Sequence, residues 1–106
     1  MRRVALTFDD IQLVPKFSKI RSRKNVDIRT SVSKNYRIKI PLVVAPMDTV
    51  CEETMAITIM DQGGVGCIHR FCSIQDQCKM VSTVFEHRRR DYKLTTYMPP
   101  IMAAIG

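Results

Sequence analysis

The sequence has no stretch that could cross a bilayer and no apolar leader. A membrane span needs roughly 20 predominantly apolar residues, and none of the apolar runs in the 106 residues approaches that length. The N-terminal segment 1–13 contains two arginines and two aspartates, and it lacks the apolar core of a signal peptide. We therefore expect a cytoplasmic chain whose cysteines are reduced thiols.

Aromatic residues are few, and the common phosphate-binding and nucleophile motifs are missing. Three tyrosines and four phenylalanines accompany a net charge of +7, and they do not alternate with the basic residues. The charge suits an anionic partner, but this pattern argues against nucleic-acid binding as the function. No G-x-G-x-x-G, Walker or nucleophile-elbow pattern occurs, and the glycines of Gly63–Gly66 precede a strand instead of opening a helix.

The four cysteines do not form a metal-binding pattern. Zinc sites usually begin with two cysteines separated by two to four residues. Cys67 and Cys72 have four residues between them, at the upper limit of that spacing, but no other pair of cysteines comes within it. Cys67 and His69 would share one face of a strand, and small core residues explain this arrangement more simply. We expect no metal site.

The sequence does contain a repeated pattern of apolar strand, helix cap and helix. Leu42–Ala45 is short, apolar and bounded by prolines, which predicts a strand buried on both faces. Val65–His69 and Ile101–Gly106 are the next two apolar runs. Residues 41–106 therefore predict a β-α-β-α-β unit of the α/β class, in which the strands are parallel.

Residues 1–40 form a separate, mostly irregular segment. Within it, Val26–Val32 alternates apolar and polar residues, which is typical of an outer strand. Asn35–Ile40 would be its partner. We therefore divide the chain into an N-terminal extension, 1–40, and the strand–helix unit, 41–106.

Two helices are predicted between the strands of residues 41–106. Thr49 and Glu52 have the spacing of a capping box, and Gly63 would end that first helix. Ser73 and Asp76 repeat the cap signal before the second helix. The apolar stripe of the second helix, which we expect to lie on the sheet, consists of Ile74, Cys78, Val81 and Phe85.

The loops that follow the strands hold the candidate ligand-binding residues. In parallel strand–helix folds, ligands bind beyond the carboxyl ends of the strands. Met47, Asp48, His69 and Arg70 occupy such loops. The fork of an arginine suits phosphate, and a methionine can lie against a flat ring. The simpler alternatives are packing for Met47, helix capping for Asp48 and a structural hydrogen bond for His69.

Four segments of the chain occur in an order typical of one enzyme family. They are LTFDDIQLVP (Leu6–Pro15), IPLVVAPMDTV (Ile40–Val50), GGVGCIHR (Gly63–Arg70) and AAIG (Ala103–Gly106). Together they resemble the N-terminal part of the IMP dehydrogenase/GMP reductase family. The resemblance implies a (β/α)8 TIM barrel, of which this chain would hold the extension packing on the barrel and about the first three strands. It also implies a purine-nucleotide oxidoreductase that uses NAD or NADP, usually as a cytoplasmic homo-tetramer.

The resemblance assigns substrate contacts to the loop after the first strand. Ala45, Met47 and Asp48 match a segment that touches the purine nucleoside monophosphate, with Met47 against the base. Ala45 stands where many dehydrogenases have a serine that helps to hold the nucleotide. The contact between that serine and the nucleotide is therefore not expected at Ala45.

The resemblance also assigns cofactor contacts. Ser22 and Arg23 resemble a reductase segment that reaches the cofactor, sometimes the cofactor of a neighbouring subunit. Arg70 takes the position of a basic residue that contacts the cofactor in reductases. The strand-end motifs lean toward conversion of IMP to XMP with NAD, as in IMP dehydrogenase. The segments around Arg23 and Arg70 lean toward the alternative, GMP reductase, which converts GMP to IMP with NADPH.

Several parts of the family pattern are missing from the chain. Residues 90–101 fill the place where many IMP dehydrogenases carry CBS modules, so we expect no such module. The family's catalytic cysteine and potassium site lie beyond the third strand, and no cysteine of this chain matches the nucleophile. The chain alone is therefore expected to be inactive, as a fragment, as one piece of a split barrel or as the ordered part of a longer protein.

If the chain is part of such an enzyme, its partner would be the rest of the barrel or a full-length subunit. An alternative of another class is a catalytically inactive truncated chain that binds a related subunit or nucleic acid.

Overall fold

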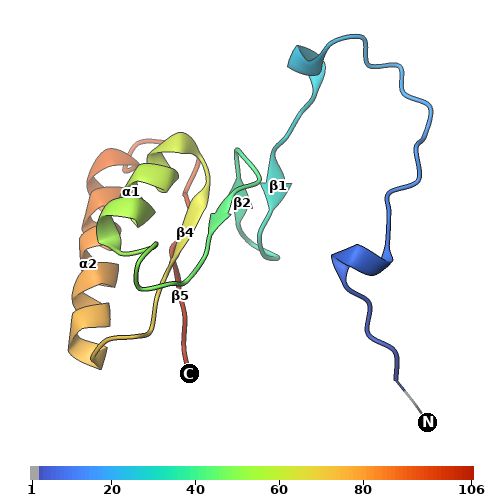
Figure 1. The fold of residues 1–106 in the computed structure, drawn as a ribbon. Helices are drawn as coiled ribbons and strands as arrows, with labels where there is room; N and C mark the ends of the chain where they lie inside the picture. The colour runs from blue at the N-terminus through green and yellow to red at the C-terminus, as the bar shows by residue number, and fades with distance from the viewer. Residues whose placement is uncertain (1–2) are drawn as a thin grey trace.

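The computed structural model describes residues 3–106, so Met1 and Arg2, where the predicted extension begins, lie outside the described residues. An extended N-terminal part leads into a packed strand–helix unit (Figure 1). The elements, in chain order, are η1 (Phe8–Asp10), η2 (Arg23–Asn25), β1 (Thr30–Ser31), β2 (Arg37–Ile38), β3 (Val43–Val44), α1 (Glu53–Gln62), β4 (Val65–Ile68), α2 (Ile74–Asp91) and β5 (Met102–Ala103).

Three of these strands form a parallel sheet with β4 at its centre. Val43 of β3 is paired with Val65 of β4, and Ile68 of β4 is paired with Ala103 of β5. Helices α1 and α2 lie side by side and pack against this sheet (Figure 1). The predicted β-α-β-α-β order and the α/β class are therefore confirmed.

The core lies between β4 and the two helices. All four residues of β4 are buried, and Ile68 packs with Met60 of α1 and Val84 of α2 in one cluster. Gly66 allows α1 to approach the strand closely, because a Cβ at this position would lie 3.0 Å from the Ala56 Cα of that helix. Burying one large apolar side chain stabilises a fold by about 1.5–3 kcal/mol. This small cluster is therefore the main contribution to the stability of the strand–helix unit.

Local signals placed one end of each helix correctly. Gly63 ends α1 in the left-handed region, with φ of 98°, and its N–H donates to the carbonyls of Ile59 and Met60. Glycine adopts this conformation without a Cβ penalty. Ser73 begins α2, and its hydroxyl oxygen accepts a 3.1 Å bond from the N–H of Asp76. Both predictions are confirmed.

The predicted capping box at Thr49 and Glu52 is wrong. Helix α1 begins only after Glu52, and no side chain caps it. The chain makes a turn first, because the N–H groups of Val50 and Cys51 both donate to the carbonyl of Met47. Thr49 therefore lies within that turn rather than at the helix N-terminus.

The predicted apolar stripe of α2 is correct only at Val81, which packs against the core cluster. Met80 and Val84 are the buried residues of this helix, whereas Ile74 is 82% exposed and Phe85 is 44% exposed. The helix is rotated so that Met80 and Val84 face the sheet, and the predicted stripe lies beside that face. Within residues 3–106, neither α2 nor any other helix combines the length and the apolar character that crossing a membrane requires.

Strand β3 was predicted to be buried on both faces, and this is wrong as well. Leu42 and Val43 are about half exposed. The reason is its place at one edge of the three-stranded sheet, because helices cover a single face there. The fully buried environment expected for β3 belongs to β4, which has a strand on each side.

The N-terminal part makes few contacts with this unit. Residues 3–29 are exposed along their whole length, and they arc away from the sheet (Figure 1). The predicted outer strands form, in shortened form, as the antiparallel pair β1 and β2, in which Thr30 is paired with Ile38. The packing of an extension, 1–40, on a complete barrel stays a prediction.

Candidate functional site

The carboxyl ends of β3, β4 and β5 lie at one edge of the sheet, because the three strands are parallel. We call the loops at this edge the rim. Ala45, Met47 and Asp48 follow β3 there, and Arg70 follows β4. The fold therefore brings four of the six predicted site residues to the same edge, where ligands bind in folds of this type.

The loop after β3 has a fixed backbone and accessible side chains. The N–H of Met47 donates to the carbonyl of Ala45 at 2.9 Å, and the carbonyl of Met47 accepts from Cys51 at 2.9 Å. Ala45, Met47 and Asp48 are all exposed. Asp48 holds the turn through its Oδ1, which accepts a 3.0 Å bond from the N–H of Thr49. A shallow groove of about 350 Å³ borders this turn.

His69 has a structural role beneath the rim and is not available as a general acid or base. It is 2% exposed, and its Nδ1 accepts a 3.0 Å bond from the backbone N–H of Phe71. An accepting Nδ1 carries no proton, so the proton lies on Nε2, which donates to Glu52 Oε1 at 2.9 Å. The simpler alternative for His69, a structural hydrogen bond, is confirmed.

Arg70 presents its guanidinium group at the rim. Its side chain is exposed and lies over the ring of Phe71, with 5.6 Å from Cζ to the ring centroid. The segment after β5 approaches it closely, because a Cβ at Gly106 would lie 2.6 Å from Arg70 Nη1. Arg70 makes no ion pair within the part of the chain that the structure describes. Its donors are therefore available to a phosphate.

Gln77 belongs to the rim, although sequence analysis missed it. Its side-chain Nε2 donates to the carbonyl of His69 at 3.0 Å and to the carbonyl of Ala104 at 2.8 Å. One signal could have found it. Gln77 precedes the buried Met80 and Val84 at spacings of three and seven residues, which places a polar side chain on the buried face of α2.

The structure does not bring the other two predicted cofactor residues to the rim. Ser22 and Arg23 lie at η2, in the exposed N-terminal part, which stands apart from the sheet (Figure 1). The hydroxyl of Ser22 accepts a 3.3 Å bond from the N–H of Lys24, which caps η2. Their contact with a cofactor stays a prediction.

The cysteines are free thiols, and two of them are buried. Burial raises the pKa of the Cys51 thiol, and the neighbouring Cys67 adds to the effect. Burial also raises the pKa of Cys67. A thiol is a weak nucleophile compared with a thiolate, so neither residue is prepared for attack. Between residues 3 and 106, no group of three or more His, Cys, Asp or Glu side chains could hold a metal ion.

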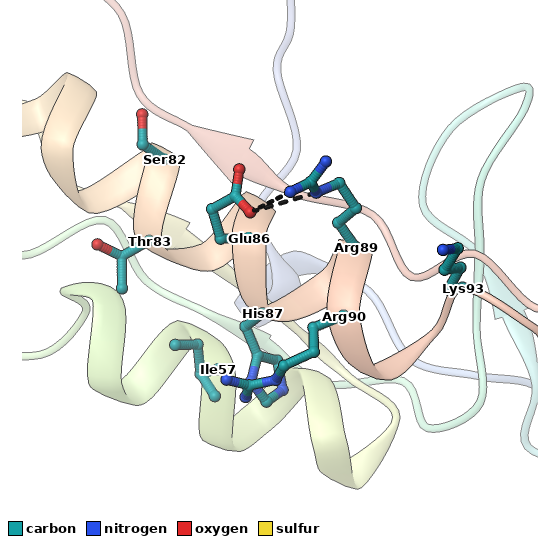
Figure 2. Close-up of a pocket in the computed structure, with 8 residues that line it drawn as sticks. All are labelled: Ile57, Ser82, Thr83, Glu86, His87, Arg89, Arg90 and Lys93. Atoms are coloured by element: carbon teal, nitrogen blue, oxygen red, sulfur yellow. Dashed lines mark hydrogen bonds and ion pairs between the residues drawn. The ribbon is translucent and has the colours of Figure 1, made fainter.

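A larger groove lies away from the rim, between α1 and the last turns of α2 (Figure 2). It has a volume of about 950 Å³ and several basic side chains. Two of these are already paired, since Arg89 lies 3.1 Å from Glu86 and Arg90 lies 2.7 Å from Asp91. Paired, exposed cations attract an anion weakly, and we assign the groove no role in binding a nucleotide.

Comparison with known proteins accounts for nearly the whole chain. Residues 5–106 match the family described as IMP dehydrogenase / GMP reductase domain. The chain is 52% identical over 79 residues to a GMP reductase from Leishmania donovani, an alignment that covers 74% of this chain and 16% of that protein. It is also 52% identical over 79 residues to an inosine-5′-monophosphate dehydrogenase from Nitrosopumilus maritimus (strain SCM1), covering 74% of this chain and 17% of that protein.

The fold is similar to that of a solved GMP reductase. A structure of GMP reductase from Trypanosoma brucei matches with a TM-score of 0.67 and 45% identity, and it covers 77% of this chain and 18% of that chain. The chain thus spans less than one fifth of the length of each of these relatives. Its strand–helix unit corresponds to the N-terminal part of their TIM barrel, and the chain belongs to the IMP dehydrogenase/GMP reductase family.

Proposed function

We propose that this chain supplies the N-terminal part of a cytoplasmic purine-nucleotide oxidoreductase. The enzyme transfers hydride between NAD or NADP and a purine nucleoside 5′-monophosphate. The observation that carries the proposal is the family match over residues 5–106, combined with a rim that is formed by the loops after β3 and β4. Catalysis requires the family's cysteine loop, which this chain lacks, so the chain acts together with the rest of a barrel.

Substrate binding is assigned to Ala45, Met47 and Asp48. Met47 is half exposed on a turn whose backbone is held by three hydrogen bonds, so its thioether can lie against a purine ring at a low cost in loop ordering. Ala45 offers its backbone and no hydroxyl. Asp48 uses one carboxylate oxygen for Thr49 and has the other for a polar group of the nucleotide.

Cofactor binding is assigned to Arg70, Ser22 and Arg23. The exposed guanidinium of Arg70 fits the phosphates of NAD or NADP, because it can donate two parallel hydrogen bonds. The cofactor supplies the hydride chemistry when it is bound. Ser22 and Arg23 stand away from this sheet, which suits contact with the cofactor of a neighbouring subunit in a homo-tetramer. The potassium site implied by the family lies outside this chain.

Two reactions of the family are compatible with this assignment. The identity to a GMP reductase and to an IMP dehydrogenase is 52% in both cases. The strand-end motifs favour oxidation of IMP to XMP with NAD, and the segments around Arg23 and Arg70 favour reduction of GMP to IMP with NADPH.

A grafted enzyme tests the proposal. Residues 5–106 would replace the matching segment of the Trypanosoma brucei GMP reductase, and the absorbance of reduced nicotinamide would be followed with GMP plus NADPH and with IMP plus NAD. We expect turnover by the graft and none by the chain alone. A folded graft that forms the normal oligomer but turns over neither pair would contradict the proposal.

A second candidate function is non-enzymatic association with a related subunit. The exposed apolar side chains of Val43, Ile74 and Phe85 favour it, because a TIM barrel covers such faces with further strands and helices. Size-exclusion chromatography of the chain mixed with the Trypanosoma brucei enzyme would detect this association. Co-elution without any gain of activity in the graft would favour this candidate over the oxidoreductase. Retention on single-stranded nucleic acid at physiological salt would instead favour the nucleic-acid alternative.

A further inference from the structure

The side-chain amide of Gln77 joins the ends of two neighbouring strands. Its Nε2 donates to the carbonyl of His69, directly after β4, at 3.0 Å. It also donates to the carbonyl of Ala104, directly after β5, at 2.8 Å. A primary amide nitrogen has two hydrogens, so both donors are used. Gln77 itself is held in the first turns of α2 and is only partly exposed.

The two chain segments that carry these carbonyls adjoin Arg70. The carbonyl of His69 belongs to the peptide bond that leads into Arg70. Ala104 is tied to β4 through its N–H, which donates to Ile68 at 2.9 Å. Two residues later, Gly106 lies so close to Arg70 that a Cβ there would come within 2.6 Å of Nη1. The strand ends that Gln77 joins are therefore neighbours of the guanidinium group.

We propose that Gln77 is a positioning residue that holds the ends of β4 and β5 together and so fixes the guanidinium of Arg70 at the rim for an anionic ligand. The ligand class, a phosphate of the nicotinamide cofactor, rests on the proposed function. The bridge itself does not, because it is given by the two hydrogen bonds. No other side chain within residues 3–106 makes a hydrogen bond to both strand ends.

The first experiment measures the bridge in the chain itself. Gln77→Met keeps the length of the side chain and removes both donors, and Gln75→Met is the matched control on the exposed face of α2. Amide hydrogen exchange would be followed at Phe71 and Ala104. We expect Gln77→Met to speed exchange at both positions by about tenfold, with no change in the core of α1 and none in the control. Unchanged exchange at both positions would overturn the proposal.

A second variant covers the case in which Gln77→Met does not fold. In Gln77→Glu the carboxylate faces two carbonyl oxygens and has no proton to donate. Below its ordinary pKa of about 4.3, the protonated acid can donate once. The measured quantity is the ratio of exchange protection at Ala104 in the variant to that in the unsubstituted chain at the same pH. We expect this ratio to rise toward one as the pH falls toward about 4. A ratio that does not depend on pH would overturn the bridge.

The link to ligand binding is tested in the grafted enzyme with NADPH as the probe. We expect Gln77→Met to raise the KM for NADPH by about tenfold, with a much smaller effect on kcat, and Gln75→Met to change neither. An inactive unsubstituted graft would contradict the proposed function, and the exchange data would then decide on the bridge alone. An active graft with faster exchange but an unchanged KM would overturn the positioning of Arg70.

Discussion

Residues 3–29 and residues 43–103 both contain large apolar side chains, but only the second region buries them. Phe8 is 93% exposed and Leu13 is 98% exposed, whereas Ile68 is 0% and Val84 is 1% exposed. In the second region strands and helices present the core side chains, such as Ile68 and Val84, to one another. In the first region no long element does so, and no surface within the described residues 3–106 covers it. Apolar composition therefore does not produce a core unless regular elements bring it into register.

The largest difference between the two regions is expected from truncating one buried and one exposed side chain. Ile68→Ala should lower the free energy of unfolding by about 2–5 kcal/mol, because it leaves a cavity beneath both helices. Leu13→Ala should change it by less than about 0.5 kcal/mol. Urea unfolding followed by circular dichroism measures both. Equal losses of unfolding free energy in the two variants would mean that the N-terminal part packs on the strand–helix unit in solution. The two regions would then not differ in burial.

A smaller effect is expected from adding one methyl group where α1 approaches β4. A Cβ at Gly66 would lie 2.8 Å from Cys51 Sγ and 3.0 Å from Ala56 Cα. Because the helix backbone must move away, Gly66→Ala should lower the free energy of unfolding by about 1–3 kcal/mol. The same urea titration gives the value. A neutral result would show that α1 is not held against the strand.

Helix caps provide a sharper test within the second region. Ser73→Ala removes the acceptor for the N–H of Asp76 and should cost about 0.5–2 kcal/mol. Thr49→Ala should cost less than about 0.5 kcal/mol, since Thr49 lies in a turn and no side chain caps α1. Thermal unfolding of the two variants decides between them. A larger loss for Thr49→Ala would restore the capping box that the sequence predicted.

The smallest expected effects are changes in side-chain pKa, which distinguish a local contact from a tertiary one. In the first region, hydrogen bonds from the side chain and the backbone of Arg29 lower the pKa of Asp27 to about 2. The partner is two residues away, so the low pKa should persist in a short peptide and in urea. Carboxyl-carbon NMR titration measures it. An ordinary pKa in the peptide would show that the pair depends on the fold.

Tyr92 behaves in the opposite way. Burial, and then the hydrogen bond from its hydroxyl to Asp61, raise its pKa to about 12, against about 10 in an unfolded chain. The folded state then holds the proton more tightly. The contribution of Tyr92 to stability is therefore present below about pH 10 and is lost as the pH rises toward about 12. Ultraviolet titration should show the late ionisation in the folded chain and its loss in urea.

Features that depend on a few neighbouring residues could be predicted from the sequence. Gly63 ends α1 because only the local backbone matters there, and Ser73 caps α2 for the same reason. The three apolar runs also contain the three parallel strands, since short continuous apolar stretches flanked by turn residues are typical of buried strands. The rim position of Met47 and Arg70 followed from that topology.

Features that depend on what covers a surface could not be predicted. The apolar stripe containing Ile74 and Phe85 has helical spacing, but Met80 and Val84 occupy the adjacent face and are the residues that reach the sheet. The bridge of Gln77 joins residues 27 positions apart in the sequence, and no local pattern specifies which carbonyls a glutamine will meet.

The position of β4 at the centre of the sheet has a consequence for the order of synthesis. During translation, β3 and α1 have already been made when β4 emerges, so one of its edges can be paired at once. The other edge must wait for β5, which follows the whole of α2. At about 5–20 residues per second, this interval lasts on the order of seconds. For that time β4, whose four residues are all buried in the folded unit, has an open edge, and the nascent chain is then most exposed to aggregation and to capture by chaperones.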